Sequence, residues 1–348
     1  MKMKKKVQMP SWPSYSEDEI HAVKKVLESN NVNYWTGDEG RKFESEFAEY
    51  LNLKKSIAVS NGTVALEVAL MSLGLNKRDE VIVTPRTFIA SVSSIVNLGL
   101  VPVFADVDLN TGNITLDSIK KAFSKRTKAI ICVHLGGYPC DMDPIMEFSK
   151  SKGIFVIEDC AQAHGAKYKN SPIGSFGDIS AWSFCQDKII STGGEGGMLA
   201  TNNIELYEKM WSFKDHGKNM KKIVRSNKSS SFNWIHDSFG SNYRMTEMQA
   251  AIGRIQLTKL SDWNEKRTLN AMKIMNHCLQ HSSLLRVPSI PDSFQHAFYK
   301  CYVYLKLENL GPEWTREKII DELNIRGTQC YPGSCSEVYL EDAFINTT

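Results

Sequence analysis

The sequence lacks the features that mark a nucleic-acid-binding, membrane-spanning or secreted protein. Its 348 residues carry 42 Lys and Arg against 39 Asp and Glu, and a net charge of +3 is too small to attract nucleic acid. No apolar run approaches the roughly 18 residues that a membrane span requires. The basic residues 1–6 lead to Pro10 and not to the apolar core of a signal peptide. We therefore predict a cytoplasmic protein with neither a nucleic-acid nor a membrane partner.

Closely spaced cysteines are also missing. No two of the eight cysteines stand at CxxC spacing, whereas zinc sites use closely spaced ligands and disulfide frameworks belong to short secreted chains. The cysteines are Cys132, Cys140, Cys160, Cys185, Cys278, Cys301, Cys330 and Cys335. We predict that all are reduced thiols and that the chain has no metal site.

What is present is the composition of an ordinary folded protein. The chain is 42% hydrophobic, 10% aromatic and 23% charged, close to average usage, so disorder and coiled coil are excluded. This length suggests two domains, or one large α/β unit with an appendage. A chain of this size buries enough surface to fold without disulfides or metals.

Short apolar runs alternate with amphipathic stretches through the first two thirds of the chain. The apolar runs predict strands at 56–60, 81–83, 101–105, 129–133, 154–157, 179–184 and 197–201. The amphipathic stretches predict helices at 16–27, 64–73, 89–98, 116–123 and 142–150. This alternation favours an α/β fold, a mainly parallel sheet covered by helices on both faces.

The pattern changes after Asn242. Residues 245–260 and 263–279 predict two long helices, and residues 297–307 predict a strand. We therefore expect a large α/β domain over residues 1–250, which includes an N-terminal helical segment, and a smaller α+β domain over residues 251–348. The polar segment 218–234 has little periodicity and predicts a mobile loop.

Residues that directly follow strands are the first candidates for a binding site, because ligands of open α/β sheets bind beyond the carboxyl ends of the strands. Ser60-Asn61-Gly62-Thr63 is a turn of small residues between a strand and a helix, where backbone N–H groups can hold a phosphate. Thr87-Phe88 follows the strand 81–83 and brings an aromatic ring to the same edge, although a core role for Phe88 is an alternative.

Two charged residues follow later strands. Asp159 comes after the apolar run 154–157, where a carboxylate is costly unless a cation or a protonated heterocycle pairs with it. A helix N-cap is the alternative. Lys188 precedes a glycine-rich run, residues 191–197, which suggests an amine held against a ligand. An ordinary surface lysine is the alternative.

Together these four positions match the needs of one cofactor. Pyridoxal phosphate (PLP) requires an anion cradle, a stacking ring, a carboxylate for its ring nitrogen and a lysine that binds its aldehyde. The order of the phosphate turn, the aromatic residue, Asp159 and then Lys188 resembles that of fold-type I PLP enzymes.

Six motifs extend this resemblance to a specific family. They are Asn33-Tyr34-Trp35-Thr36-Gly37, Ser60-Asn61-Gly62-Thr63, Thr87-Phe88-Ile89-Ala90-Ser91, Glu158-Asp159-Cys160-Ala161-Gln162, residues 183–188 with Thr192-Gly193-Gly194-Glu195-Gly196-Gly197, and Asn242-Tyr243-Arg244-Met245. From about residue 10 to 340 the chain resembles the DegT/DnrJ/EryC1/StrS family, PLP-dependent aminotransferases that act on nucleotide-linked keto sugars. The resemblance implies a fold-type I large domain and a smaller C-terminal domain.

By this resemblance, four side chains surround the cofactor ring. Lys188 forms the imine with the cofactor and is the catalytic residue that moves the proton. Asp159 pairs with the pyridinium nitrogen, Gln162 contacts the phenolic side of the ring, and Phe88 stacks on its face.

The resemblance also implies how the phosphate is held. Gly62 and Thr63 bind it through backbone N–H groups, and the hydroxyl of Ser183 assists. Asn242 reaches the phosphate from the neighbouring subunit, which implies a homodimer with shared active sites.

Other roles are weaker hypotheses. Tyr34, Trp35 and the segment 218–234 are candidates for contacting the sugar and the nucleotide. His134 and His164 also lie near strand ends, and we interpret both as structural.

The implied reaction transfers an amino group from L-glutamate to a nucleotide-linked 3-keto or 4-keto 6-deoxyhexose, in amino-sugar synthesis for a surface polysaccharide. The dehydratase branch of the family has a histidine where Lys188 stands, so the lysine favours transamination over deoxygenation. The nucleotide base, the sugar stereochemistry and the aminated carbon stay open.

Two alternatives remain at this point. The first is a PLP enzyme acting on amino acids, a lyase or a desulfurase, in which Arg316 or Arg326 would bind the α-carboxylate. The second is a PLP-binding regulator without turnover, although no DNA-binding extension is present. Family members usually continue beyond a segment like 334–344, so we also expect that the chain lacks the usual C-terminal tail.

Overall fold

The computed structural model describes residues 11–226, 234–334 and 337–345. A seven-stranded sheet forms its centre, with the strands in the order β1-β9-β8-β5-β4-β2-β3. Their bounds are β1 Lys55–Val59, β2 Glu80–Val83, β3 Val101–Phe104, β4 Thr127–Val133, β5 Phe155–Asp159, β8 Ile179–Ser183 and β9 Gly197–Thr201. Strands β8, β5, β4, β2 and β3 are parallel, and β9 runs antiparallel to both β8 and β1. The predicted mainly parallel sheet is confirmed.

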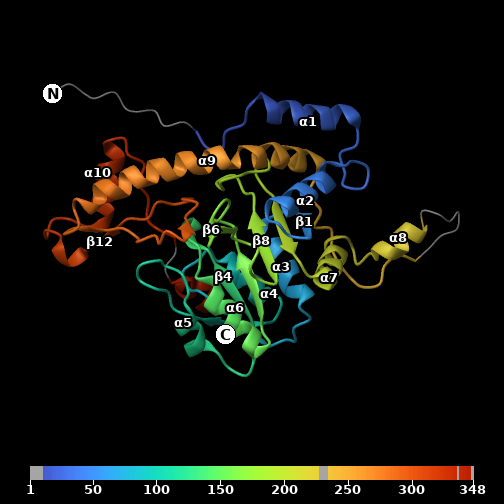
Figure 1. Ribbon diagram of the computed structural model, residues 1–348, viewed down its shortest axis with the longest axis horizontal. Coiled ribbons are helices and arrows are strands. Elements are labelled where there is room, and N and C mark those ends of the chain that lie inside the picture. The colour runs from blue at the N-terminus through green and yellow to red at the C-terminus, as the bar shows by residue number, and fades with distance from the viewer. Residues whose placement is uncertain (1–10, 227–233, 335–336, 346–348) are drawn as a thin grey trace.

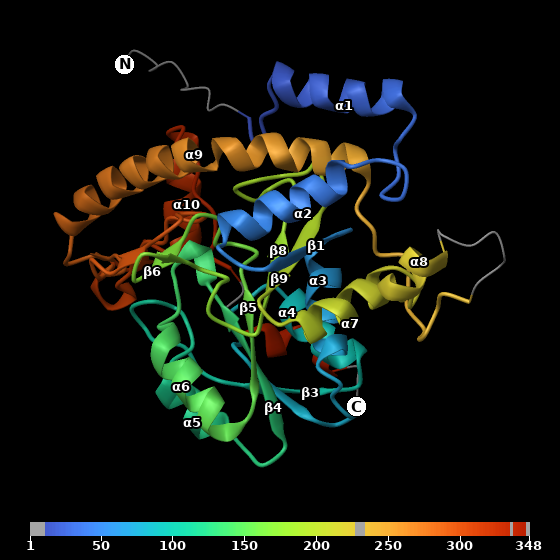
Figure 2. The same ribbon diagram turned by 45° about the vertical axis from the view of Figure 1, so that its right-hand side comes forward.

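Helices cover both faces of this sheet and create two hydrophobic cores (Figures 1 and 2). The first core contains residues of α2 (Glu39–Tyr50), α5 (Leu116–Ala122), α6 (Met142–Lys152) and α9 (Glu247–Leu279). The second core contains residues of α3 (Gly62–Ser72), α4 (Ala90–Asn97) and α7 (Ile204–Lys214). Neighbouring residues of β4 alternate between the cores, Ile130 in the first and Ile131 in the second, as the pleat of a strand requires.

The long helix α9 differs from the prediction of two helices over residues 245–260 and 263–279. It runs unbroken over 33 residues, because no glycine or proline interrupts the chain after Gly253 and Thr246 caps its first turn. It packs against α1 (Glu17–Ser29) and α2, and then extends toward the C-terminal part of the molecule (Figure 1). The helix therefore crosses residue 250, and the division into domains at that residue stays a prediction.

The C-terminal part contains short strands and one longer helix. Strand β10 (Leu285–Arg286) pairs with β12 (Tyr304–Leu305), and α10 spans Arg316–Ile325. Strand β11 (Phe294–Gln295) pairs with β6 (Lys167–Tyr168), which also pairs with β7 (Ser171–Pro172). The remaining short elements are η1 Leu135–Gly137, η2 Leu307–Asn309, η3 Val338–Leu340 and α11 Asp342–Ile345.

The strand predicted over 297–307 is reduced to Tyr304–Leu305. The residues before it bind the loop after β4, where Ala297 N donates to Gly137 O and Lys300 N donates to Gly136 O. The backbone of this segment is therefore used to join the C-terminal part of the chain to the edge of the central sheet.

Part of the predicted mobile loop is helical. Helix α8 (Met220–Ser226) occupies the first half of segment 218–234 and projects from the body of the molecule beside α7 (Figures 1 and 2). Residues 227–233 of that segment lie outside the described residues.

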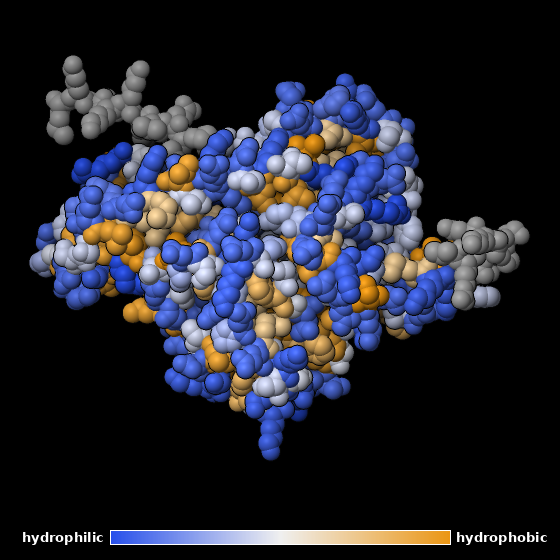
Figure 3. Space-filling model, viewed as in Figure 1, coloured by the Kyte–Doolittle hydropathy of each residue, from blue (hydrophilic) through white to orange (hydrophobic). Residues whose placement is uncertain are grey.

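Hydrophilic residues predominate on the face shown in Figure 3, with small hydrophobic patches between them. Among the described helices, none combines the length and the apolar character needed to cross a membrane.

Candidate active site

Lys188 lies in the loop that follows β8, with its side chain 15% exposed. Its Nζ donates to Tyr299 Oη at 3.3 Å and lies 3.6 Å from Asp187 Oδ2. The hydroxyl of Tyr299 in turn donates to Asp187. Because the amine is mostly enclosed and its polar partners among the described residues are Tyr299 and Asp187, it is not the ordinary surface lysine that was the alternative.

The backbone around Lys188 is shaped by glycines. A bridge joins Cys185 to Gly194, and Gln186 N donates to Gly194 O at 3.0 Å. Gly194 has φ +124°, a conformation that side-chain-bearing residues rarely adopt. The glycine-rich run therefore folds back on the strand end and fixes the loop that carries the lysine.

Asp159 ends strand β5 and is 5% exposed. Its Oδ2 accepts a hydrogen bond from Ser91 Oγ at 2.7 Å, and its Oδ1 accepts one from Ala161 N at 3.1 Å. Burial raises the pKa of Asp159, while the bond from Ser91 and the charge of Lys188 act in the lowering direction. A carboxylate buried in this way is stabilised by a cationic partner, such as a protonated ring nitrogen.

The turn at 60–63 lies against the end of β8. Asn61 caps helix α3 by accepting from Val64 N at 2.9 Å. A Cβ on Gly62 would lie 2.6 Å from the Cβ of Ser183, so only glycine lets the turn approach this serine. Gly62 and Thr63 open the helix, where backbone N–H groups lack intrahelical acceptors. The structure thus brings Gly62, Thr63 and Ser183 together as an anion cradle.

Phe88 and Gln162 are the remaining residues predicted to contact the cofactor ring. The phenyl ring of Phe88 is 69% exposed, so it is not the core residue that was the alternative. Gln162 is 8% exposed, and its Oε1 accepts from Gly136 N at 2.6 Å. An uncovered aromatic ring near the end of β2 is suited to stack on a planar ligand.

These features fit PLP. The enclosed amine of Lys188, the buried carboxylate of Asp159 and the anion cradle at Gly62 supply the three polar contacts that the cofactor needs. Phe88 supplies an exposed ring.

Comparison with known proteins identifies the family to which the chain belongs. The model of the DegT/DnrJ/EryC1/StrS aminotransferase family matches residues 13–342. The chain belongs to this family. It is therefore a PLP-dependent aminotransferase, and the fold-type I architecture and the cofactor predicted from the sequence are confirmed.

The similarity of the chain to individual proteins supports this family assignment. A solved aminotransferase from Psychrobacter cryohalolentis is 54% identical, covers 98% of this chain and 88% of its own, and superposes with a TM-score of 0.95. GDP-perosamine synthase of Escherichia coli O157:H7 is 43% identical over 73% of this chain and 67% of its own length. The structure of E. coli GDP-4-keto-6-deoxy-D-mannose-3-dehydratase with bound hydrated PLP is 27% identical, covers 97% and 89% of the two chains, and has a TM-score of 0.85.

Three further residues predicted in the aminotransferase site have other partners in the structure. Asn242 is exposed, and its backbone bridges to Asp215. Tyr34 is 4% exposed, and its hydroxyl donates to Glu44 at 3.1 Å. The indole of Trp35 donates to Asp215 at 2.8 Å. A contact between Asn242 and the phosphate across a dimer, and substrate contacts by Tyr34 and Trp35, stay predictions.

The arginines considered for the amino-acid alternative are exposed. Arg316 pairs with Glu317, and its side chain is 61% exposed. Arg326 pairs with Glu322, and its side chain is 74% exposed. Neither lies in an enclosed position of the kind that binds a substrate carboxylate.

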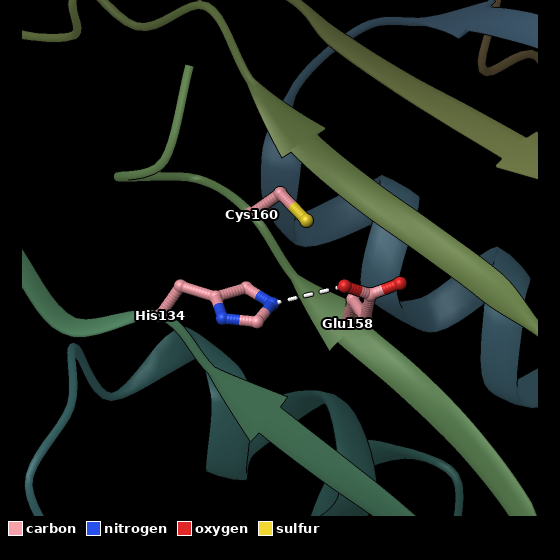
Figure 4. A group of neighbouring side chains, drawn as sticks. All are labelled: His134, Glu158 and Cys160. Carbon is pink, nitrogen blue, oxygen red and sulfur yellow. Dashed lines mark hydrogen bonds and ion pairs between the residues drawn. The ribbon is translucent and has the colours of Figure 1, made fainter. Parts of the chain in front are cut away.

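Near the active site, His134, Glu158 and Cys160 form a buried cluster (Figure 4). Cys140 N donates to His134 Nδ1 at 3.0 Å, so the opposite nitrogen carries the proton and donates to Glu158 at 3.1 Å. The Glu158 carboxylate also accepts three backbone N–H groups, those of Gly174, Phe176 and Gly177. Both ring nitrogens and the carboxylate thus have protein hydrogen-bond partners, and the cluster ties the ends of β4 and β5 to the loop before β8.

His164 agrees with the structural interpretation. It is fully buried between Trp182 and Phe184, with ring centroids 5.1 and 5.6 Å away, and burial lowers its pKa to about 3. A neutral, enclosed imidazole fills space in the core of the aminotransferase.

Two site residues were missed by sequence reasoning. Tyr299 reaches Lys188 from 111 positions further along the chain, and no local pattern marks it. Ser91 stands in the Thr87–Ser91 motif, and its position one helical turn after Thr87 could have indicated a polar contact.

Proposed function

We propose that this aminotransferase transfers an amino group from L-glutamate to a nucleotide-linked 6-deoxyhexose that carries a keto group at C3 or C4. The family and its relative GDP-perosamine synthase support a nucleotide-linked sugar as the amino acceptor. The observation that carries the proposal is the enclosed amine of Lys188 held by Tyr299 and Asp187. A lysine at this position, where the family's dehydratases have a histidine, favours amino transfer.

Most of the predicted site residues would hold the cofactor, and one would move a proton. PLP, when bound, supplies an electron sink for the carbon that gains or loses the amino group. Asp159 would accept a hydrogen bond from the ring nitrogen and keep the proton there, because a buried carboxylate is stabilised by a cationic partner. Gly62, Thr63 and Ser183 bind the phosphate, and Gln162 contacts the phenolic side.

Lys188 is the residue that moves the proton. Its Nζ would accept a proton from the carbon that loses the amino group and would later donate one to the keto carbon that gains it, the role of a general base and acid placed beside the cofactor. Tyr299 and Asp187 hold the amine in place during this transfer, since both lie within 3.6 Å of Nζ. Their position keeps the side chain from rotating into solvent.

The dimer is the second part of the proposal. The side chain of Asn242 is exposed, and two strongly exposed aromatic residues precede it in the chain, Trp234 at 81% and Phe239 at 100%. Exposed aromatic residues close together in the sequence favour a protein interface. We therefore propose a homodimer in which Asn242 completes the phosphate site of the partner.

Trp35 is the stronger of the two substrate candidates. Tyr34 is enclosed by Glu44 and by Lys214, whose ammonium lies 3.9 Å from the tyrosine ring centre. Trp35 is only partly buried and shares Asp215 with Arg244 of the Asn242 motif. We propose that Trp35 contributes to sugar binding beside the dimer interface. Tyr34 would support the Trp35 side chain and would not contact the sugar itself.

The enzyme would act in the cytoplasm, in the synthesis of an amino sugar for a surface polysaccharide. Nucleotide-linked sugars are the precursors that such an enzyme would use.

A spectroscopic experiment tests the reaction. The purified protein mixed with PLP should show a visible absorption band, and L-glutamate should abolish that band as the amino group passes to the cofactor. Lys188→Ala should lose the cofactor attachment that borohydride makes permanent, whereas the control Lys169→Ala, an exposed lysine paired with Asp143, should retain it. Wild-type protein that takes up no PLP, or whose band glutamate leaves unchanged, would contradict the proposal.

A further inference from the structure

Two arginines from distant parts of the chain have no polar side-chain partner among the described residues. Neither the guanidinium group of Arg86 nor that of Arg286 has a hydrogen bond or ion pair with the described residues. Nε of Arg86 and Nη1 of Arg286 are both buried without an acceptor. A charged N–H donor that is buried without an acceptor is unfavourable, so these groups require a partner from outside the described chain.

Two tyrosines hold the arginines close together. The guanidinium carbon of Arg86 lies 5.2 Å from the ring centre of Tyr302 and 5.3 Å from that of Tyr304. The guanidinium carbon of Arg286 lies 4.1 Å from the same Tyr304 ring. Both positive charges therefore flank one aromatic ring. Aromatic faces attract a guanidinium without using its N–H groups, which stay free for a ligand.

Tyr304 adds a further unused group, because its hydroxyl is buried without a partner. The tyrosine rings are stacked, with their centres 6.2 Å apart, and the Tyr302 hydroxyl bonds to Ser334 at 2.5 Å. Arg286 and Tyr304 are paired residues of strands β10 and β12. The cluster therefore combines two cationic groups and a hydroxyl, held in place by the paired strands β10 and β12 and by the stacked tyrosine rings.

Glycines make room for the cluster. A Cβ on Gly112 would lie 2.6 Å from Nη1 of Arg86, and Gly112 has φ +73°. A Cβ on Gly136 would lie 2.7 Å from Cε2 of Tyr302. The Arg86 guanidinium and the Tyr302 ring are thus set into the fold beside backbone that carries no side chain.

The cluster borders the cofactor residues on two sides. Gly136, which contacts Tyr302, donates its N–H to Oε1 of Gln162. Arg86 precedes Thr87 and Phe88, the motif that brings the exposed ring to the site. The cluster therefore adjoins residues that are predicted to contact the cofactor ring.

We propose that Arg86 and Arg286, supported by Tyr302 and Tyr304, bind an oxyanion of a substrate. The proposed reaction offers two sources of that chemistry, the carboxylates of L-glutamate and the phosphates of the nucleotide, and the inference rests on the proposed function for this choice. Both are planar or tetrahedral oxyanions that guanidinium groups bind through paired N–H donors. The bound oxyanion would accept hydrogen bonds from the buried N–H donors and would lie between the two positively charged guanidinium groups.

The experiment compares Arg86→Gln and Arg286→Gln with wild-type holoenzyme. The matched control is Arg326→Gln, which removes an exposed arginine paired with Glu322. One arm measures the L-glutamate concentration that half-saturates the loss of the visible band. The other arm measures binding of UDP, GDP and dTDP to the holoenzyme by calorimetry. An unchanged PLP band and melting temperature show that each variant is folded.

We expect about a 10-fold or larger weakening in one arm for both site variants, since each loses a charge-assisted hydrogen bond. The control should stay within twofold of wild type. Weakening confined to glutamate identifies the donor carboxylate, and weakening confined to the nucleotides identifies the phosphates. Arg86→Lys, which keeps the charge but not the paired donors, should recover only part of the affinity.

Several outcomes would overturn the inference. The first is that both site variants bind glutamate and the nucleotides as tightly as wild type does. The second is that Arg326→Gln loses as much affinity as the site variants. The third is that wild-type protein binds neither glutamate nor a nucleotide. The proposed function fails separately. If wild-type protein binds nucleotide through both arginines but glutamate leaves its band unchanged, the donor assignment is wrong and the anion site stands. If glutamate converts every variant normally and nucleotide binding is also unaffected, the reaction stands and the anion site is wrong.

Discussion

At the scale of single residues, the function depends on burying charged groups that need partners. Asp159 is 5% exposed, and its known partners are a serine hydroxyl and a backbone N–H, neither of which is cationic. The sequence could predict this position, because an acidic residue after an apolar strand is unusual. It could not predict Ser91 as the partner, since that contact forms only when α4 packs beside the end of β5.

Asp159→Asn tests the role of this charge. We expect kcat to fall by about 100-fold, because a neutral amide loses the charge-assisted interaction with the ring nitrogen. Asp178→Asn is the control, since Asp178 is also a carboxylate that accepts a backbone N–H, from Val156. Steady-state amino transfer at saturating substrates checks both variants. Equal activities of Asp159→Asn and wild type would contradict the role assigned to Asp159.

Buried histidines predict how stability depends on pH. Burial lowers the pKa of His296 to about 3, from an ordinary value of 6.5. Between these values the unfolded chain binds more protons than the folded chain, so the free energy of unfolding falls as the pH drops below about 6.5. The contribution of this histidine is at most about 1.4 kcal/mol per pH unit.

Urea unfolding at several pH values between 4 and 7 measures this slope. His296→Gln should make the slope shallower, because the variant has no imidazole to protonate on unfolding. A slope that is the same in the variant and the wild type would show that His296 is not held neutral in the folded protein.

At the scale of elements, the ends of strands and their turns create the site. The alternation of apolar runs and helices located the strands within a few residues, and the turn at 60–63 was recognisable from its small residues. The close approach of Gly62 to Ser183 was not, because Gly62 follows β1 and Ser183 ends β8, and β9 separates these two strands in the sheet. Sheet order depends on long-range pairing that local sequence patterns do not contain.

Gly62→Ala tests this approach. The added Cβ would meet the Cβ of Ser183 at 2.6 Å, so the turn must shift, at a cost of about 1–3 kcal/mol in stability. We expect the dissociation constant of PLP, measured by titrating the visible band, to rise at least 10-fold. Gly311→Ala is the control, because the nearest atoms to its Cβ would belong to the flexible carboxylate of Glu313, at 3.0 Å. Unchanged PLP affinity in Gly62→Ala would refute the proposed cradle.

The C-terminal elements were harder to predict for a physical reason. The segment 297–307 has the composition of a strand, yet its backbone bonds to the loop at Gly136 and Gly137. Likewise, the helices expected on either side of residue 261 are one helix, since Ser261 and Asp262 continue a helix that packs on α1 and α2. In both places tertiary contacts override local preference.

At the scale of the whole molecule, the described chain supplies Lys188, Asp159 and the anion cradle, while Asn242 is exposed on it. Asp215 organises that region. It accepts from Trp35 at 2.8 Å, Lys218 at 3.0 Å and Arg244 at 2.6 Å, so one buried carboxylate fixes the N-terminal motif and the Asn242 motif together. The motifs were visible in the sequence, but their connection through Asp215 was not, because no motif contains that residue.

Subunit mixing tests the proposed shared site. Lys188→Ala and Asn242→Ala should each be inactive as homodimers. In a mixed dimer one site receives both substitutions and the other receives neither. Unfolding and refolding an equimolar mixture should therefore restore about a quarter of wild-type activity. No recovery, measured beside a wild-type sample refolded in the same way, would place Lys188 and Asn242 in the same site of one chain.

The central claim is that the chain moves nitrogen from glutamate to a nucleotide-linked keto sugar. The most direct measurement incubates the holoenzyme with ¹⁵N-labelled L-glutamate and UDP-, dTDP- and GDP-linked 3-keto and 4-keto 6-deoxyhexoses, followed by mass spectrometry of the nucleotide sugars. We expect one ¹⁵N atom in an amino-sugar product, together with 2-oxoglutarate in equal amount. Keto sugars that stay unlabelled, or that lose oxygen without gaining nitrogen, would contradict it.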